Sequence, residues 1–163
     1  MMVMKCIKIF KLLSAVLVLM LVQSCSDRLH TIFTDYYVSI KNEDGAASSV
    51  VDASQDNLLV TYYIYLVAPI LDEDVVVNYS VEPGDGLKEG VDYKLTSASG
   101  KVTISPGITR MPVRVTFLRH EVDPQKDNTL TLKLTSCSNP SIRIGYPGPD
   151  ALFSSHIVTK RNF

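Results

Sequence analysis

Few residues of this 163-residue chain have the types and spacing that catalysis or metal binding requires. The three histidines, His30, His120 and His156, have no neighbour at the spacing of metal ligands. No serine stands in the G-x-S-x-G pattern of a nucleophile elbow, and no histidine is placed to activate Cys137. We interpret Cys137 as a small buried hydrophobic residue near a strand end. The sequence therefore predicts no catalytic residue, no metal site and no cofactor, and we expect a protein that is not an enzyme.

Two short motifs look like ligand sites but have a simpler structural explanation. Asp72-Glu73-Asp74 carries three carboxylates, which hard cations prefer. Consecutive strand residues point to alternate faces, so we expect these side chains to diverge in a solvated turn. The glycines of Gly84-Asp85-Gly86 suggest a phosphate loop, but no helix follows to supply backbone amides. This segment is predicted to be a hairpin loop.

Tyrosine is in excess, with eight Tyr against five Phe and no Trp. Within residues 58–66, alternation places Tyr62 with the apolar residues of a core-facing side. Tyr63 and Tyr65 then share the opposite face, where exposed rings can stack on a sugar or anchor a partner protein. The alternative is a central strand that is covered on both faces. Tyr63 and Tyr65 are the candidate binding residues, although the lack of Trp weakens the sugar interpretation.

The N-terminus has the layout of a bacterial secretion signal. A basic segment with Lys5, Lys8 and Lys11 precedes an apolar run of 11 residues, 12–22. This run is shorter than the roughly 20 residues that span a membrane. The small residue Ser24 precedes Cys25 where the apolar run stops, as in the lipobox of lipoproteins. We expect a signal peptide over 1–24 and lipid attachment at Cys25; the alternative is a plain secretory signal with a chance cysteine.

Removal of that signal changes the charge and the cysteine content. The remaining chain has 13 basic and 17 acidic residues, a net charge of −4, which makes nucleic acid a poor partner. Cys6 leaves with the signal and Cys25 carries lipid, so no intramolecular disulfide is possible.

The 139 residues from Cys25 onward suit one domain, with a tether over 25–35 and a folded part over 36–163. Period-two alternation marks most of the folded part, whereas no segment shows a 3.6-residue period. Turn residues separate these runs at short spacing. The pattern predicts an all-β antiparallel sandwich, with strands expected over 36–41, 58–68, 75–81, 102–104, 113–117, 130–134, 142–144 and 152–160.

One stretch resembles a known domain family. Glu89-Gly90-Val91-Asp92-Tyr93 is followed by residues 100–109, GKVTISPGIT, and then by two long alternating strands. This order resembles Calx-beta domains over Val60 to Lys160 and implies an immunoglobulin-like sandwich. Together with the signal, the chain is similar to Bacteroidota outer-membrane lipoproteins that carry such a domain. That resemblance suggests a location at the outer membrane beside glycan-uptake machinery.

The resemblance has one departure that bears on metal binding. Calcium-binding members carry an acidic run near the last strand, whereas residues 154–160 here read SSHIVTK. Calcium is therefore not expected. We interpret Gly90, Asp92 and Tyr93 as a structural corner, because glycine accepts positive φ and aspartate bonds nearby backbone N–H groups. Asp92→Ala is then expected to cost about 1 kcal/mol.

These inferences lead to one expected function and two alternatives. We expect a membrane-anchored, non-catalytic binding or scaffold lipoprotein that contacts the membrane through its lipid and binds either a glycan or an outer-membrane protein. The alternatives are a pilus-type structural subunit or adhesin, and an enzyme whose site is assembled from distant residues. Only Ser26-Asp27 follows Cys25 where surface-export signals are acidic, so the periplasmic and surface faces both stay open.

Overall fold

The computed structural model describes residues 35–97 and 100–163, in which all regular structure is β. Cys25, the predicted signal and all of the tether except Asp35 lie outside the described residues. No helix in the described part could cross a membrane. The ten strands are β1 (Tyr36–Asn42), β2 (Ser48–Asp52), β3 (Leu58–Val67), β4 (Val75–Pro83), β5 (Tyr93–Leu95), β6 (Lys101–Ile104), β7 (Arg110–Phe117), β8 (Thr129–Cys137), β9 (Ile142–Ile144) and β10 (Ser155–Arg161).

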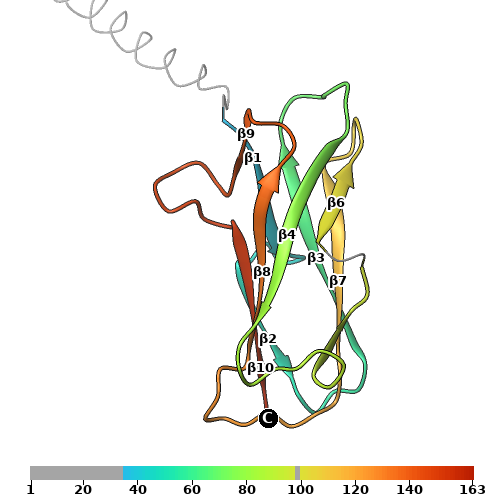
Figure 1. Cartoon of the computed structure of the whole chain (residues 1–163), viewed down its shortest axis with the longest axis vertical. Coiled ribbons are helices and arrows are strands. Elements are labelled where there is room, and N and C mark those ends of the chain that lie inside the picture. Colours follow the sequence, from blue (N-terminus) through green and yellow to red (C-terminus); the bar gives the residue numbers. More distant parts are fainter. Residues whose placement is uncertain (1–34, 98–99) are drawn as a thin grey trace, which may run out of the picture. The chain divides into compact units, whose positions relative to one another are not determined.

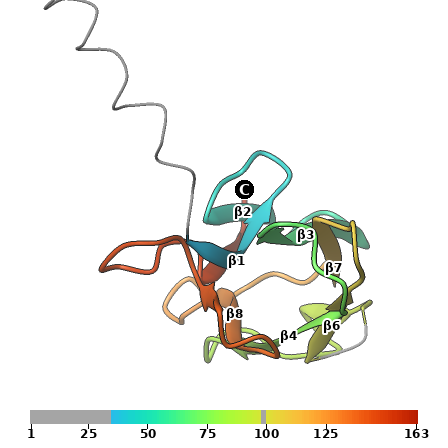
Figure 2. The ribbon, with the colours of Figure 1, turned by 90° about the horizontal axis from the view of Figure 1, so that it is seen from above.

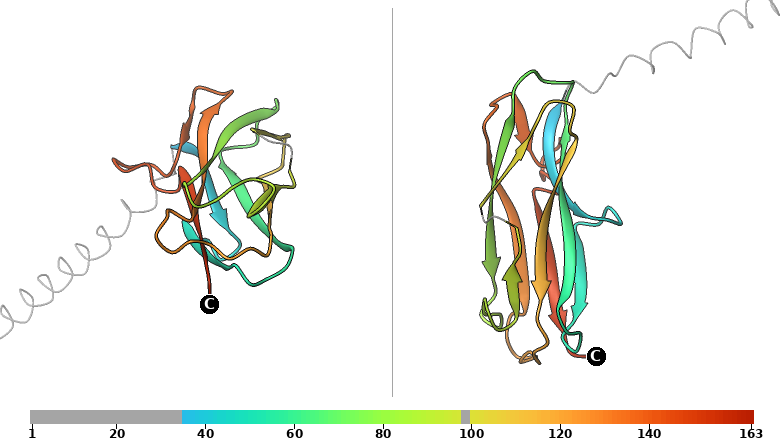
Figure 3. Two further views of the ribbon diagram at one scale, coloured as in Figure 1. Left: turned by 60° about the horizontal axis from the view of Figure 1, so that its bottom comes forward. Right: turned by 90° about the vertical axis from the view of Figure 1, so that its right-hand side faces the viewer.

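The strands form two five-stranded sheets that pack face to face (Figures 2 and 3). Sheet A has the order β5-β7-β3-β1-β9, and sheet B has the order β2-β10-β8-β4-β6. Most neighbours are antiparallel, while β1 with β9 and β2 with β10 are parallel pairs at the sheet margins. The predicted immunoglobulin-like sandwich is confirmed.

Period-two alternation accounts for the core between the sheets. On β3, Tyr62 and Ile64 point inward and are fully buried, as the sequence predicts. On β7 the inward residues are Val113, Val115 and Phe117, and on β8 they are Leu130, Leu132 and Leu134. Each sheet thus has one apolar face, and the two faces bury each other.

Sequence alternation missed two strands and misplaced the starts of two others, of which β7 begins at Arg110 and not at Val113. β2 lies in a stretch that reads as small and polar, and β5 has only three residues. Both depend on partners distant in sequence: β2 pairs with β10, and β5 pairs with β7. The last strand was expected from Leu152 but begins at Ser155, because Ala151 and Phe153 have positive φ angles of 41° and 61°.

The segment 145–154 folds against the margin of β1 beyond β9 (Figure 1). The N–H of Ile40 donates to the carbonyl of Phe153 at 2.9 Å. Tyr146 packs edge-on against Tyr37, with ring centroids 5.2 Å apart. This cover explains why β1 is buried on both faces, including the polar Ser39.

The two ends of the sandwich carry different loops (Figure 1). β1 begins at the end that also holds the β3–β4, β6–β7 and β8–β9 connections. The β4–β5 and β7–β8 connections and the C-terminus lie at the opposite end. The described chain therefore enters at one end of the sandwich and leaves at the other.

Candidate binding surface

Tyr63 and Tyr65 lie side by side on the outer face of β3. Their ring centroids are 6.1 Å apart and the ring planes are inclined by 55°. Both side chains are half-buried, whereas Ile64 between them and the preceding Tyr62 are fully buried on the core side. We call Tyr63 and Tyr65 the tyrosine strip; it is open to solvent but supported by strands on both sides.

Charged neighbours hold the tyrosine strip in place. Arg110 on β7 is the register partner of Tyr65, and its guanidinium lies 4.6 Å from the centroid of the Tyr63 ring. The Tyr63 hydroxyl donates to Glu43 at 3.3 Å. On the other side, Lys41 is opposite Tyr63, and its ammonium lies 4.3 Å from the centroid of the Phe153 ring. Cation–π contacts thus fix two of the rings at this surface.

The outer face of sheet A is cationic. Register places Arg114 beside Thr61, Lys94 beside Thr116 and Arg143 beside Tyr37, all on the face of the tyrosine strip. We call this surface, with Lys41, Lys94, Arg110, Arg114 and Arg143, the cationic face. No acidic residue occupies an outward strand position there, whereas the strands of sheet B contain both Asp52 and Glu82.

The predicted structural corner lies at the end of the sandwich away from the start of β1. Gly90 has a φ of 83°, and its N–H donates to the carbonyl of Tyr93 at 2.8 Å. Asp92 accepts from the backbone N–H of Lys88 at 2.9 Å through Oδ2. Tyr93 is buried at the start of β5. The three residues therefore form one compact turn.

Asp92 has a second role that the sequence did not reveal. Its Oδ1 lies 3.0 Å from Nζ of Lys160, and the two side chains are 3% and 0% exposed. His120 reaches the same oxygen at 2.9 Å from the solvent side. Burial alone would raise the pKa of Asp92, but hydrogen bonds from Lys160, the Lys88 amide and His120, with the Lys160 charge, hold it below its ordinary value.

The sequence contained a usable signal for Lys160. In β10, His156, Val158 and Lys160 all point toward the core, and the residues between them point outward or are less buried. This alternation could have placed Lys160 inside, where a lysine needs a partner. Both faces of the segment contain polar residues, which concealed the pattern.

His156 forms a second buried polar cluster. Its ring has no exposed surface; Nε2 lies 3.0 Å from Ser49 Oγ, and Nδ1 lies 3.1 Å from the carbonyl oxygen of Ala46. Because a carbonyl only accepts, we assign the proton to Nδ1 and let Nε2 accept from Ser49. Burial lowers the pKa of His156, outweighing the Ala46 hydrogen bond that would raise it.

The Ser49–His156 pair has the spacing of a nucleophile and its base, but its position favours a structural role. His156 is sealed between the sheets, with its ring centroid 4.7 Å from that of Tyr62. Acyl transfer also needs donors aimed at a developing oxyanion beside an accessible serine. We therefore assign the pair to the link between β2 and β10.

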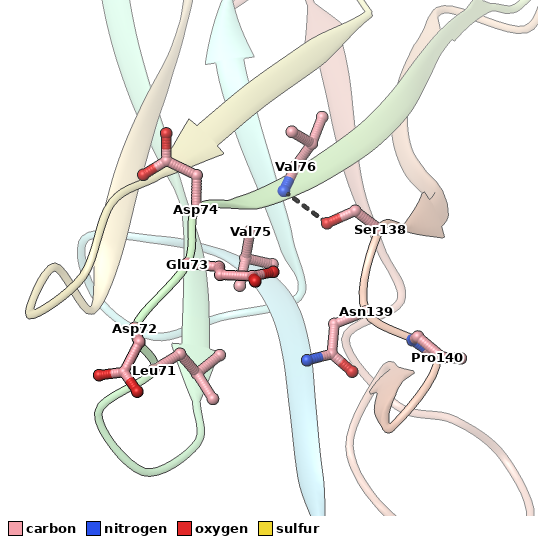
Figure 4. Close-up of a pocket in the computed structure, with 9 residues that line it drawn as sticks. All are labelled: Leu71, Asp72, Glu73, Asp74, Val75, Val76, Ser138, Asn139 and Pro140. Carbon is pink, nitrogen blue, oxygen red and sulfur yellow. Dashed lines mark hydrogen bonds between the residues drawn. The ribbon is translucent and has the colours of Figure 1, made fainter.

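The acidic motif diverges, as the sequence predicts (Figure 4). Asp72, Glu73 and Asp74 line an open groove of about 570 Å³ with Ser138 and Asn139, and their carboxylates point in different directions. Ser138 Oγ accepts from the N–H of Val76 at 2.9 Å and so is already engaged. In the described part of the chain, no group of three or more His, Cys, Asp or Glu residues could hold a metal ion.

The glycine-rich segment packs against the β7–β8 connection. The N–H of Gly84 donates to the carbonyl of Thr129 at 2.8 Å, and that of Gly86 donates to Asp127 at 2.9 Å. A Cβ on either glycine would overlap Asp127 or Asn128. Glycine is therefore needed here for close contact between two loops.

Comparisons with known proteins support the fold and little more. No protein-family model matches the chain, and no curated protein is similar to it. A solved protein of unknown function from Bacteroides ovatus superposes with a TM-score of 0.53 at 16% identity, covering 78% of this chain and 47% of that one. CBD12 from CALX1.2 gives a TM-score of 0.48 at 14% identity, covering 74% of this chain and 44% of that one.

This chain thus spans less than half the length of either protein. At these identities the likeness concerns the fold alone.

Cys137 has the structural environment that its sequence suggested. It ends β8, opposite Val77, and is partly buried against the core. Its thiol is free.

Proposed function

We propose that this protein is a non-catalytic binding module, held at a membrane of the cell envelope by lipid on Cys25, whose partner docks on the tyrosine strip. The observation that carries the proposal is the pair of half-exposed rings of Tyr63 and Tyr65, set beside Arg110 on a rigid sheet. Tyrosine and arginine are the residue types that concentrate binding energy at interfaces.

The fold supports this proposal physically. β3 is central in sheet A, and hydrogen-bonded partners flank it on both sides. The rings therefore keep their spacing before a partner arrives, which reduces the entropy lost on binding. The predicted signal and the resemblance to Bacteroidota lipoproteins support a place at the outer membrane beside glycan-uptake machinery, and this assignment is part of the proposal.

A capture experiment tests the binding role. Immobilised wild type and Tyr63→Ala/Tyr65→Ala are exposed to solubilised envelope, and retained protein and carbohydrate are both analysed. The matched control is Val50→Ala/Ile157→Ala, which removes two exposed apolar side chains, 52% and 43% exposed, from the outer face of sheet B. Only the tyrosine double variant should lose its partner; equal retention by all three proteins would overturn the assignment of the strip.

Fatty-acid labelling tests the anchor. Wild type should take up label and sediment with membranes, whereas Cys25→Ala should do neither, because the predicted modification requires the cysteine thiol. Cys137→Ala is the control, since it removes the free thiol of the domain. Equal labelling of wild type and Cys25→Ala would contradict lipidation at this residue.

A further inference from the structure

Most cations of the cationic face have no carboxylate partner among the described residues. Arg143 lies 3.8 Å from Asp35. Among the described residues, Lys41, Lys94, Arg110 and Arg114 take part in no salt bridge. Glu43 is the carboxylate in contact with the tyrosine strip, through the Tyr63 hydroxyl. An excess of positive charge therefore gathers on one face of a chain whose net charge is −1.

The remaining acidic residues lie elsewhere. In the described part, all of them except Asp52 and Glu82 occupy connections between strands or, like Asp35, directly precede β1. The negative net charge thus belongs mainly to the loops, and the cationic face is a local reversal of sign. Such a reversal favours an anionic partner at this face despite the overall charge.

The positive groups are spread along the sheet and not gathered at one point. Arg110 and Arg114 are four residues apart on β7, or about 13 Å. Lys94 lies on β5, on the far side of β7 from the tyrosine strip, and Lys41 lies on β1, on the other side of β3. Charges at these intervals match a ligand whose own charges repeat along its length.

From this arrangement we propose that the ligand of the cationic face is an acidic polysaccharide, whose sugar rings stack on Tyr63 and Tyr65 and whose carboxylate or sulfate groups pair with Arg110 and Arg114. This inference rests on the proposed function, because it names the partner class of the same surface. Arginine binds carboxylate and sulfate-like oxygens with two parallel N–H donors. The ring faces offer apolar area to sugar C–H groups, while the tyrosine hydroxyls keep hydrogen-bonding capacity.

The shape of the surface distinguishes a polysaccharide from an acidic protein. Protein partners usually place anchor side chains in well-packed pockets. The hollows described at this domain, such as the groove lined by Leu71 and Ser138, do not include the tyrosine strip. Strand side chains with half-exposed rings form a shallow surface, which suits an extended polymer.

The test uses the full folded domain and defined polymers. Retention in affinity electrophoresis is measured with polygalacturonate, with the same polymer fully methyl-esterified, with dextran sulfate, with dextran and with poly-L-glutamate. Wild type should be retarded by polygalacturonate or dextran sulfate but not by the neutral polymers. The polygalacturonate and dextran sulfate arms distinguish recognition of carboxylate from recognition of sulfate. Binding should be lost in about 1 M salt, where the Debye length is about 3 Å.

Two charge-reversal variants of equal net charge localise the site. Arg110→Glu/Arg114→Glu should weaken retention at least about tenfold, because each charge-assisted contact becomes repulsive. Lys101→Glu/Lys133→Glu changes two exposed lysines on sheet B and should leave retention within about twofold. If the double variant is unstable, Arg114→Glu alone replaces it in this test. Among the described residues, the side chain of Arg114 makes no hydrogen bond or ion pair that the substitution would break.

Several outcomes would overturn the inference. Equal retention by the methyl-esterified polymer would show that charge is not recognised, and preferential binding of poly-L-glutamate would indicate an acidic protein. Retention unchanged by the Arg110 and Arg114 reversals would place the ligand elsewhere. If the tyrosine double variant loses its captured envelope partner while no polysaccharide binds, the ligand class is wrong and the binding role stands; if capture persists in that variant, the role of the strip itself is wrong.

Discussion

Asp92 joins two parts of the molecule at the scale of single atoms. One carboxylate oxygen caps the turn before β5 through the Lys88 amide, and the other neutralises Lys160 on β10. The turn belongs to the approach to sheet A, whereas β10 belongs to sheet B. A buried charge pair of this kind is costly to break, because the remaining ion keeps its desolvation penalty.

Asp92→Ala should therefore lower the free energy of unfolding by about 3–5 kcal/mol, because it strands the Lys160 ammonium in the core. This exceeds the roughly 1 kcal/mol expected from the turn alone. Urea denaturation measures the change. His120→Gln removes the partner whose side chain is 52% exposed and should cost less than about 1 kcal/mol. A small effect of Asp92→Ala would mean that Lys160 finds solvent or another acceptor.

Both buried polar clusters make the protein sensitive to acid. The pKa of His156 is lowered by burial, so in mildly acidic solution the unfolded chain binds a proton that the folded chain refuses. Stability should then fall as the pH drops below about 6.5, the ordinary pKa of histidine, and stay level above it. The lowered pKa of Asp92 adds a further loss below about pH 4, the ordinary pKa of aspartate.

His156→Gln should flatten the stability profile between pH 5 and about 6.5, since glutamine does not titrate. The urea midpoint at a series of pH values provides the measurement. Wild type, which keeps His156, should show the decline over this range. A decline that survives in His156→Gln would show that the acid sensitivity over this range does not come from His156.

At the scale of the element, β3 divides its tyrosines between two environments. Tyr62 has no exposed surface, and burial raises its pKa to about 12. Its hydroxyl makes no hydrogen bond, although Ser49, which is bonded to His156, lies near it. Tyr63 and Tyr65 face outward and contact charged side chains.

Alanine substitutions on β3 should separate packing from binding. Tyr62→Ala should cost about 3–5 kcal/mol, as large-to-small changes in a core do. Tyr63→Ala/Tyr65→Ala should together cost only about 1–2 kcal/mol, the scale of cross-strand pairs on an open face. Thermal and urea unfolding of both variants decide the matter, and a loss as large as that of Tyr62→Ala would show that the strip serves the fold and not a partner.

A second substitution at Tyr62 refines the same comparison. Tyr62→Phe removes a buried hydroxyl that lacks a partner and keeps the ring, so stability should not fall. A loss above about 1 kcal/mol would reveal a hydrogen bond from Tyr62, with Ser49 as the nearest candidate.

At the scale of the whole molecule, we expect calcium to leave the domain unchanged. Residues 154–160 contain no carboxylate, and the side chains of Asp72, Glu73 and Asp74 diverge. A cation that binds only the folded state must raise the melting temperature. Melting should therefore be the same in millimolar calcium and in chelator; a rise of several degrees with calcium would contradict this expectation.

The sequence by itself determined the sandwich, the core side of β3 and the turn role of Gly90, Asp92 and Tyr93, because alternation and turn chemistry act over a few residues. Only the tertiary structure decided which strands pair with one another and which side chains meet across the core. The pairing of β2 with β10 and of β5 with β7 brings together segments that are far apart in the chain. The same is true of two side-chain contacts, Asp92 with Lys160 and Ser49 with His156. The cationic face likewise required the register of five strands, since no local run of Lys or Arg foretells that Lys41, Lys94, Arg110, Arg114 and Arg143 share one surface. Local periodicity fixes which side of a strand is apolar, whereas strand order and register fix which side chains meet.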